Sequence, residues 1–289
     1  MLNTTDKEGI RYIEHCKIIV NDDRLSLIRR EDSLEKFFSI PYFNLSVLLL
    51  GEGTSITQKA AKFLAGQGVM LGFVGTGGTP LFMASQNEYR PTHYFNNYIR
   101  KWIDEDERLK LAKVFQEKRI EYLKLTWNDI FDGKYDSKIH TLSSEYLNEI
   151  AVAKDQNSIL LSEAKFTKSL YKILRNDYNP DFLRIQGQRK DYFNSNLDDG
   201  NYLAYGLASV ALWTLGIPAS MPVLHGKTRN GGFVFDIADI IKDGVILPHA
   251  FLAADTLISG TEFRGYCIEK LDKYQSMDYI FKTLSKVIL

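Results

Sequence analysis

The spacing of apolar residues in the first 85 positions predicts short β-strands separated by turns. Asn21, Asp22 and Asp23 give a turn signal after the first apolar segment. The next segment alternates, because Leu25 and Leu27 are separated by polar Ser26. Strand-length apolar segments cover residues 10–20, 24–30, 45–50, 69–74 and 79–84. We therefore expect a β-rich N-terminal region.

One helix is predicted inside this region, at 55–66. Apolar residues from Ile56 to Leu64 recur at helical spacing, and Thr54 or Ser55 can cap the helix. Further on, the glycine-rich segment 75–80 is not followed by Lys-Ser or Lys-Thr and precedes a strand, which argues against a phosphate-binding loop. We interpret that segment as a hairpin turn.

From about Tyr89 the periodicity becomes helical. The segment 128–144 is polar and turn-rich, and Asn179-Pro180 marks a loop. Helical patterns cover 102–125, 144–174, 201–215, 235–241 and a closing helix near 269–289. The expected fold class is α+β, with an N-terminal β-rich domain at 1–85 and a larger all-α domain at 86–289.

Bulk composition excludes several protein classes. The 289 residues are 45% hydrophobic, enough for a substantial core, and two distant cysteines make no disulfide framework. We find neither a signal peptide nor an apolar run long enough to span a membrane, so we expect a cytoplasmic protein. The net charge of zero argues against a nucleic-acid-binding protein unless basic residues are segregated into a patch.

The segment from His225 to Asp239 carries the clearest chemical signal. A histidine is followed by a basic, glycine-rich turn and then by two aspartates, Asp236 and Asp239, three residues apart. On a helix these aspartates share one face. Asp239 lies among isoleucines and alanine, where burial of an unpaired carboxylate is costly. Asp236 can equally be a carboxylate of a first helical turn, and His225 a structural histidine.

Glu163 has no such local signal. It lies in Leu161-Ser162-Glu163-Ala164, where a solvated helix face explains it equally well. The segment from Glu163 to Lys190 nevertheless holds seven basic residues against three acidic ones. Such a local excess can contact a nucleic-acid backbone.

Three segments resemble one known family. They are LSEA at 161–164, NYLAYGL at 201–207, and HGK at 225–227 followed by FVFDIADIIK at 233–242. The stretch 163–251 resembles the CRISPR-associated spacer-acquisition integrase, the catalytic subunit of the adaptation complex. LGEGTSIT at 50–57 and GVMLGF at 68–73 are similar to that family's β-domain, and GTGGTPLF at 75–82 resembles subtype I-F.

The resemblance implies a metal-dependent DNA endonuclease and integrase of antiviral defence. Its metal ligands would be Glu163, His225 and Asp239, with Asp236 as an adjacent catalytic residue. Two carboxylates and an imidazole suit Mg²⁺ or Mn²⁺. Such an ion can activate water for hydrolysis or a DNA 3′-hydroxyl for strand transfer into a CRISPR array.

The resemblance also implies partners. We expect double-stranded and partly single-stranded DNA, a homodimer, and a second core adaptation protein, which in subtype I-F is fused to a helicase-nuclease. Tyr202 and Tyr205 can stack on DNA, although helical aromatic residues often pack in a core. The candidate DNA contacts are Lys165, Lys168, Lys172, Arg184, Arg189, Tyr202, Tyr205, Lys227 and Arg229.

Two other functions remain open at this point. A catalytically idle DNA-binding scaffold of the same fold has no need of Glu163, His225 and Asp239 together. An unrelated helical metal phosphoesterase would act on small substrates, whereas the basic segment favours a polymer.

Overall fold

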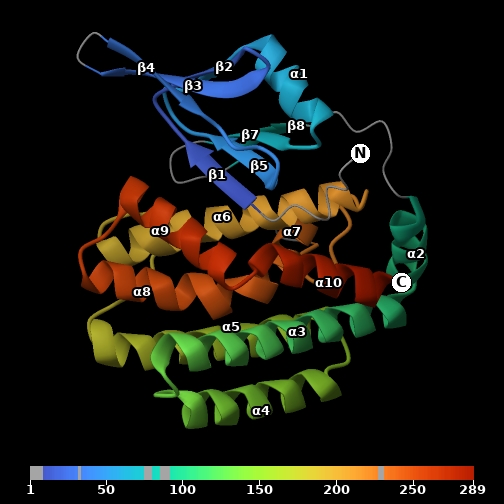
Figure 1. Cartoon of the computed structure of the whole chain (residues 1–289). Coiled ribbons are helices and arrows are strands. Elements are labelled where there is room, and N and C mark those ends of the chain that lie inside the picture. Colours follow the sequence, from blue (N-terminus) through green and yellow to red (C-terminus); the bar gives the residue numbers. More distant parts are fainter. Residues whose placement is uncertain (1–8, 32–33, 75–79, 85–91, 227–230) are drawn as a thin grey trace. The chain divides into compact units, whose positions relative to one another are not determined.

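The computed structural model describes residues 9–31, 34–74, 80–84, 92–226 and 231–289. The chain forms two compact units, Met1–Arg90 and Pro91–Leu289 (Figure 1). The described part of the first unit consists of strands with one helix, and the described part of the second is helical. The predicted α+β class is therefore confirmed.

The described strands of the N-terminal unit form two four-stranded sheets around one helix. One sheet has the order β1 (Gly9–Ile13), β5 (Leu45–Leu50), β7 (Met70–Val74) and β8 (Pro80–Ala84). The other has the order β4 (Leu34–Ser39), β3 (Arg24–Glu31), β2 (Lys17–Asn21) and β6 (Ser55–Ile56). Apolar residues of both sheets and of α1 (Gln58–Gly66) share one core, which includes Ile18, Leu25, Leu48, Ala60 and Leu64.

Most predicted strands are confirmed, but the segment 10–20 is not a single strand. It divides into β1 and β2, which lie in different sheets, and the chain turns at His15 with a positive φ of 50°. The N–H of His15 donates to the carbonyl of Glu52 at 2.9 Å. An apolar run could not reveal this break, because both strands bury residues in the same core.

The turn signal at Asn21–Asp23 is confirmed. Asp22 and Asp23 adopt left-handed φ values of 46° and 55° between β2 and β3, whose residues Asn21 and Arg24 pair. The following strand β4 was not predicted, because all six of its residues are exposed and leave no apolar alternation.

The predicted cap of the first helix is wrong. Ser55 and Ile56 form the short strand β6, and α1 is capped by Thr57, whose Oγ1 accepts the N–H of Ala60 at 3.3 Å. Strand pairing with β2 takes Ser55 out of the helix. Of the predicted hairpin turn at 75–80, all but Pro80 lies outside the described residues, and the flanking strands β7 and β8 pair antiparallel.

The described helices of the C-terminal unit are α2 (Thr92–Ile103), α3 (Glu105–Phe131), α4 (Asp136–Val152), α5 (Gln156–Tyr178), α6 (Tyr192–Thr214), α7 (Gly232–Ile241), the π-helical turn η2 (Lys242–Ile246), α8 (Leu247–Asp255), α9 (Gly260–Lys273) and α10 (Ser276–Ile288). In Figure 1, α3, α4 and α5 run alongside one another at one side of this unit. No helix in the described part of the chain is long and apolar enough to cross a membrane.

Three helical predictions need correction. The segment 144–174, predicted as one helical pattern, is divided between α4 and α5, which are separated by residues 153–155. The segment 128–144, predicted as turn-rich, is helical except for a short turn after Phe131, because α4 buries Ile139, Tyr146 and Ile150 at helical spacing. The predicted closing helix is two helices, α9 and α10. They are separated at Gln275, which adopts a left-handed φ of 48° without any glycine or proline to signal it.

Helix α6 brings the parts of the later site together. It packs against α7, η2, α8 and α9. A Cβ added at Gly200 on α6 would lie 2.5 Å from Cγ2 of Ile246, so the glycine permits close approach of η2. Phe233, Ile237 and Ile241 bury the other side of α7 in the core.

Candidate metal centre

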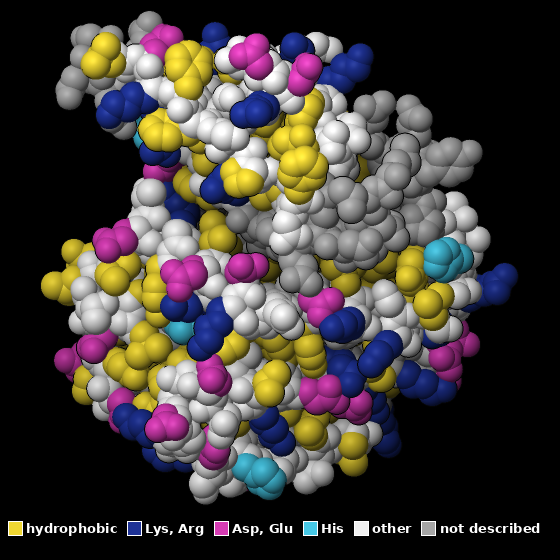
Figure 2. Space-filling model, viewed as in Figure 1, with side chains coloured by type: hydrophobic (Ala, Val, Ile, Leu, Met, Phe, Trp, Pro, Cys, Tyr) yellow, Lys and Arg dark blue, Asp and Glu magenta, His cyan; other side chains and the backbone are white. Residues whose placement is uncertain are grey.

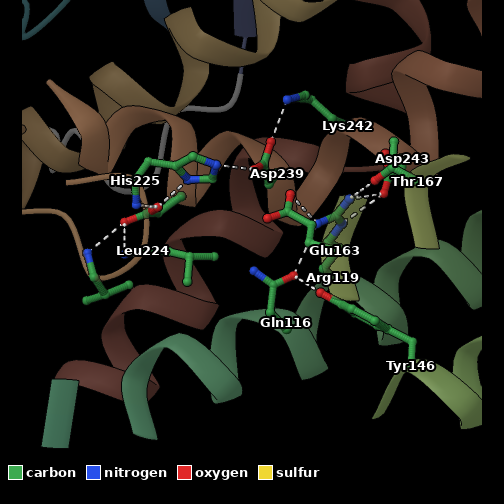
Figure 3. Close-up of polar contacts among 12 residues, drawn as sticks. Gln116, Arg119, Tyr146, Glu163, Thr167, Leu224, His225, Asp239, Lys242 and Asp243 are labelled. Carbon is green, nitrogen blue, oxygen red and sulfur yellow. Dashed lines mark hydrogen bonds and ion pairs between the residues drawn. The ribbon is translucent and has the colours of Figure 1, made fainter. Parts of the chain in front are cut away.

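Three side chains from separate parts of the chain converge in the helical unit. Glu163 lies on α5, His225 on the loop before α7, and Asp239 on α7. One ligand atom of each lies within 4.8 Å of the others, and His225 Nε2 is 4.0 Å from Oδ2 of Asp239. Figure 3 shows Asp239 between His225 and Glu163. These residues form a group that could hold a divalent metal ion.

His225 is oriented by Asp236. The Nδ1 atom of His225 lies 2.7 Å from Oδ1 of Asp236, and this carboxylate also accepts the backbone N–H groups of Val223, Leu224 and His225. A hydrogen bond from Nδ1 to the carboxylate leaves the lone pair of Nε2 directed toward Asp239. The expected placement of Asp236 in a first helical turn is wrong, because α7 begins at Gly232.

Asp239 is buried, and a lysine neutralises its charge. Its Oδ1 accepts a hydrogen bond from Nζ of Lys242 at 2.5 Å, and that ammonium lies 5.3 Å from the ring centroid of Tyr205. Burial alone would raise the pKa of Asp239, but Lys242, Arg119 and His225 lower it to about 2. The site therefore contains a charged carboxylate at neutral pH.

Glu163 is mostly buried, so a solvated helix face does not describe it. Its side chain is 12% exposed, and its Oε1 accepts Nη1 of Arg119 at 2.8 Å. Burial raises the pKa of Glu163, and the Arg119 guanidinium opposes this effect. For His225, burial lowers the pKa, but the hydrogen bond to Asp236 and the nearby carboxylates raise it overall.

Arg119, Lys242 and Asp243 complete the site, and local sequence patterns singled out none of them as a functional residue. Arg119 on α3 is 3% exposed, and it bridges Glu163 and Asp243, which follows Lys242 in η2. In the sequence, Arg119 is one of many charges on a long helix. Nothing but the packing of α3 against α5 and α7 distinguishes it from the exposed ones.

The three candidate ligands line a pocket of about 420 Å³. Its walls come from α3, α5, α6, α7, η2 and the loop after α5. Arg184, Gln186, Asn201 and Tyr205 also line it. The pocket therefore combines cationic, amide and aromatic groups beside the candidate ligands.

The predicted DNA-contact residues are distributed unevenly. Arg184 and Tyr205 line the pocket, and Tyr202 packs edge-on against Tyr205. Lys168 and Lys172 are exposed on α5. Lys227 and Arg229 lie outside the described residues.

Acidic residues balance part of the predicted basic segment. Arg184 donates to Asp198 at 2.6 Å, and Arg189 forms an ion pair with Asp199. Lys165 is exposed and paired with Glu149 on α4. On the face seen in Figure 2, acidic and basic side chains are interspersed over the helices, in agreement with the net charge of zero.

The comparison with protein families shows which family the chain belongs to. The family model described as "CRISPR associated protein Cas1" matches residues 13–251. The chain belongs to the Cas1 family. Two Cas1 relatives, each named "CRISPR-associated endonuclease Cas1", come from Pectobacterium atrosepticum and Pseudomonas aeruginosa. Each is 39% identical over 97% of this chain, covering 92% and 93% of those relatives.

Solved structures agree with the Cas1 fold. A TtCas1–DNA complex superposes with a TM-score of 0.71 at 19% identity, over 97% of this chain and 91% of that one. A casposase bound to integration product gives a TM-score of 0.68 at 14% identity, over 96% and 82%. A Cas6-RT-Cas1–Cas2 complex gives 0.65 at 14% identity, over 98% of this chain and 35% of that one.

Proposed function

We propose that this Cas1-family chain is a metal-dependent DNA endonuclease and integrase. It inserts short foreign DNA fragments into a CRISPR array through attack of a DNA 3′-hydroxyl on a phosphodiester. The observation that carries the proposal is the convergence of Glu163, His225 and Asp239 within 4.8 Å beside one pocket. The endonuclease names of the relatives and the integration product of the casposase support it.

The donor set fits Mg²⁺ or Mn²⁺. Two carboxylates and one imidazole are hard or borderline ligands, and three protein ligands leave coordination positions for water and phosphate. When bound, such an ion polarises a phosphodiester and lowers the pKa of a nucleophilic oxygen. Asp236 fits the site because it holds the His225 ring with Nε2 toward Asp239.

The chain's own cations balance the acidic groups of the site. Lys242 is hydrogen-bonded to Asp239, and Arg119 is hydrogen-bonded to Glu163. Two buried carboxylates this close would otherwise repel each other and take up a proton. Arg119 and Lys242 therefore favour the ionised form of the two carboxylates, which is the form that binds a metal ion.

We further propose that DNA approaches the pocket along α5 and the loop after it. Arg184 and Tyr205 line the pocket, and Lys168 and Lys172 are exposed on α5. Lys165, Arg189, Tyr202, Lys227 and Arg229 remain candidate contacts. The TtCas1–DNA complex among the similar structures supports DNA as the substrate.

The assignment of partners is part of the same proposal. We infer a homodimer that assembles with the second core adaptation protein, and the Cas6-RT-Cas1–Cas2 complex supports such an assembly. Membership of subtype I-F, with that partner fused to a helicase-nuclease, rests on the segment 75–82. We assign residues 1–85 to a β-rich domain and 86–289 to the metal-binding catalytic domain, in a cytoplasmic prokaryotic protein.

An idle DNA-binding scaffold is the remaining alternative, since the family match excludes an unrelated phosphoesterase. A strand-transfer assay distinguishes the integrase from the idle scaffold. Asp239→Ala should abolish Mg²⁺- or Mn²⁺-dependent joining of a short DNA to a repeat-containing target. Asp129→Ala, which removes an exposed carboxylate paired with Lys273, is the matched control. Undiminished joining by Asp239→Ala would overturn the site assignment.

A further inference from the structure

A π-helical turn directly follows the helix that carries Asp239. In η2 the N–H of Leu247 donates to the carbonyl of Lys242, five residues earlier, instead of the α-helical four. Turns of this kind are rare and frequently occur at functional sites. The turn contains both Lys242 and Asp243, whose side chains line the pocket.

The backbone of this turn depends on a residue from another helix. The carbonyl of Asp243 would accept from Leu247 in an α-helix, but that N–H is bonded to Lys242. In a continuing π-helix the donor would be residue 248, which is Pro248 and has no N–H. Trp127 on α3 supplies the donor instead, since its Nε1 lies 2.7 Å from the Asp243 carbonyl oxygen.

Close packing holds the turn against α3. A Cβ added at Gly244 would lie 2.7 Å from Cδ1 of Tyr122 and 2.8 Å from Oγ1 of Thr126. Only a glycine lets the backbone approach this closely. Trp127 is itself 1% exposed, so its indole cannot move away without opening the core.

The side chain of Asp243 then holds Arg119. Its Oδ2 accepts Nε of Arg119 at 2.8 Å and Nη2 at 2.5 Å. The remaining Arg119 donors reach Thr167 at 3.0 Å, Gln116 at 3.1 Å and Glu163 at 2.8 Å. Figure 3 shows Arg119 enclosed by these residues.

The hydrogen bonds to Asp243, Thr167, Gln116 and Glu163 use every N–H donor of the Arg119 guanidinium. An arginine has five N–H groups, and here one is on Nε and two are on each terminal nitrogen. All five are engaged within the protein, so Arg119 has no free donor for a DNA phosphate although it lines the pocket. Its effect on the reaction is therefore exerted through Glu163.

We propose that the π turn, fixed by the Trp127 hydrogen bond, positions the Glu163 carboxylate for metal binding. Trp127 and Asp243 are positioning residues, because they orient Arg119, which in turn fixes Oε1 of Glu163. This inference deepens the proposed function, since it rests on Glu163 being a metal ligand. It assigns a role to two residues that are not among the three candidate metal ligands.

The first test removes only the indole donor. Trp127→Phe keeps an aromatic ring but leaves the Asp243 carbonyl without its partner. We expect Mn²⁺ affinity, measured by isothermal titration calorimetry on the full-length protein, to fall about tenfold. DNA affinity measured without metal should stay unchanged. Trp213→Phe, the same substitution at a half-buried tryptophan of α6, should leave Mn²⁺ affinity unaltered.

The second test acts at the carboxylate and does not depend on the fold tolerating a change at Trp127. Asp243→Asn keeps an acceptor for Arg119, whereas Asp243→Ala removes it. Mn²⁺ affinity should therefore fall more in the alanine variant than in the asparagine variant. A purely structural role would lower the unfolding temperature without this order in metal affinity.

The Glu163→Gln variant distinguishes failure of the positioning role from failure of the proposed metal site. If Glu163→Gln weakens Mn²⁺ binding but Trp127→Phe and both Asp243 variants bind Mn²⁺ like the unchanged protein, the positioning role is overturned and the metal site stands. If Glu163→Gln itself leaves Mn²⁺ affinity unchanged, the proposed metal site fails and this inference fails with it.

Discussion

The carboxylate of Asp236 on α7 holds the preceding loop in place, because it contacts both the ring and the backbone N–H of His225. Its Oδ1 lies 2.7 Å from Nδ1 and 3.1 Å from the N–H of the same residue. Oδ2 accepts the N–H groups of Val223 and Leu224 at 2.7 and 3.1 Å. One buried side chain thus sets both the path of the loop and the orientation of the imidazole.

Asp236→Asn should therefore impair the metal site without removing a ligand. An amide has only one acceptor oxygen, so either the ring or the loop backbone loses its partner. We expect strand-transfer activity to fall about 10- to 100-fold, in line with other changes behind a ligating histidine. The loss is measured as strand-transfer activity over a series of Mg²⁺ or Mn²⁺ concentrations. Asp129→Asn is the control, and equal activity of both variants would contradict the orienting role.

DNA binding should depend steeply on salt. If exposed lysines of α5 neutralise DNA phosphates, binding releases counterions and the logarithm of affinity falls linearly with that of salt. Replacing Lys168 and Lys172 with glutamine should lower that slope by about two. Lys118→Gln, which removes a lysine paired with Glu121 on α3, should not change it. A slope unaffected by the double substitution would rule out α5 as the DNA-facing surface.

Acid should destabilise the fold through His249. This histidine of α8 is 4% exposed, its Nδ1 lies 2.8 Å from the Tyr266 hydroxyl, and burial together with Lys270 and Lys273 lowers its pKa to about 3. The folded state therefore keeps it neutral, whereas the unfolded chain takes up a proton below pH 6.5. Stability is lost as pH falls from 6.5 toward 3, by about 1.4 kcal/mol per pH unit at most.

Denaturant unfolding at a series of pH values checks this. His249→Gln should flatten the acid side of the curve, even if it lowers stability at pH 7. His93→Gln, at an exposed histidine of α2, should leave the slope unchanged. The same acid slope in the His249 variant would show that other groups cause the loss.

Two glycines of α6 should respond in opposite ways to alanine. At Gly200 the new methyl meets Ile246, so we expect a loss of about 1–3 kcal/mol. A Cβ added at Gly206 would meet no atom within 4 Å beyond the adjoining backbone of α6, so helix propensity should stabilise the fold by about 0.5–1 kcal/mol. Adding Ile246→Ala to Gly200→Ala should recover part of the loss in a double-mutant cycle. Strictly additive effects would contradict the contact.

Local patterns predicted much of the secondary structure. Buried strands β5 and β7 are short apolar runs between turn signals, and the hairpin at Asp22 and Asp23 follows from residues that tolerate left-handed backbone. Where an element lacked such a pattern, the prediction failed. Strand β4 is exposed on both faces, and the break between α9 and α10 falls at Gln275.

The sequence by itself determined the α+β class and made Asp239 conspicuous, since a carboxylate among isoleucines needs a partner. Tertiary structure decided what that partner is and where the Glu163 side chain lies. Lys242 neutralises Asp239. Arg119, which lies on a helix distant in sequence, forms a hydrogen bond with the mostly buried Glu163. Periodicity reports which face of a helix is buried. It does not report which buried charges meet, because that depends on how α3, α5 and α7 pack together.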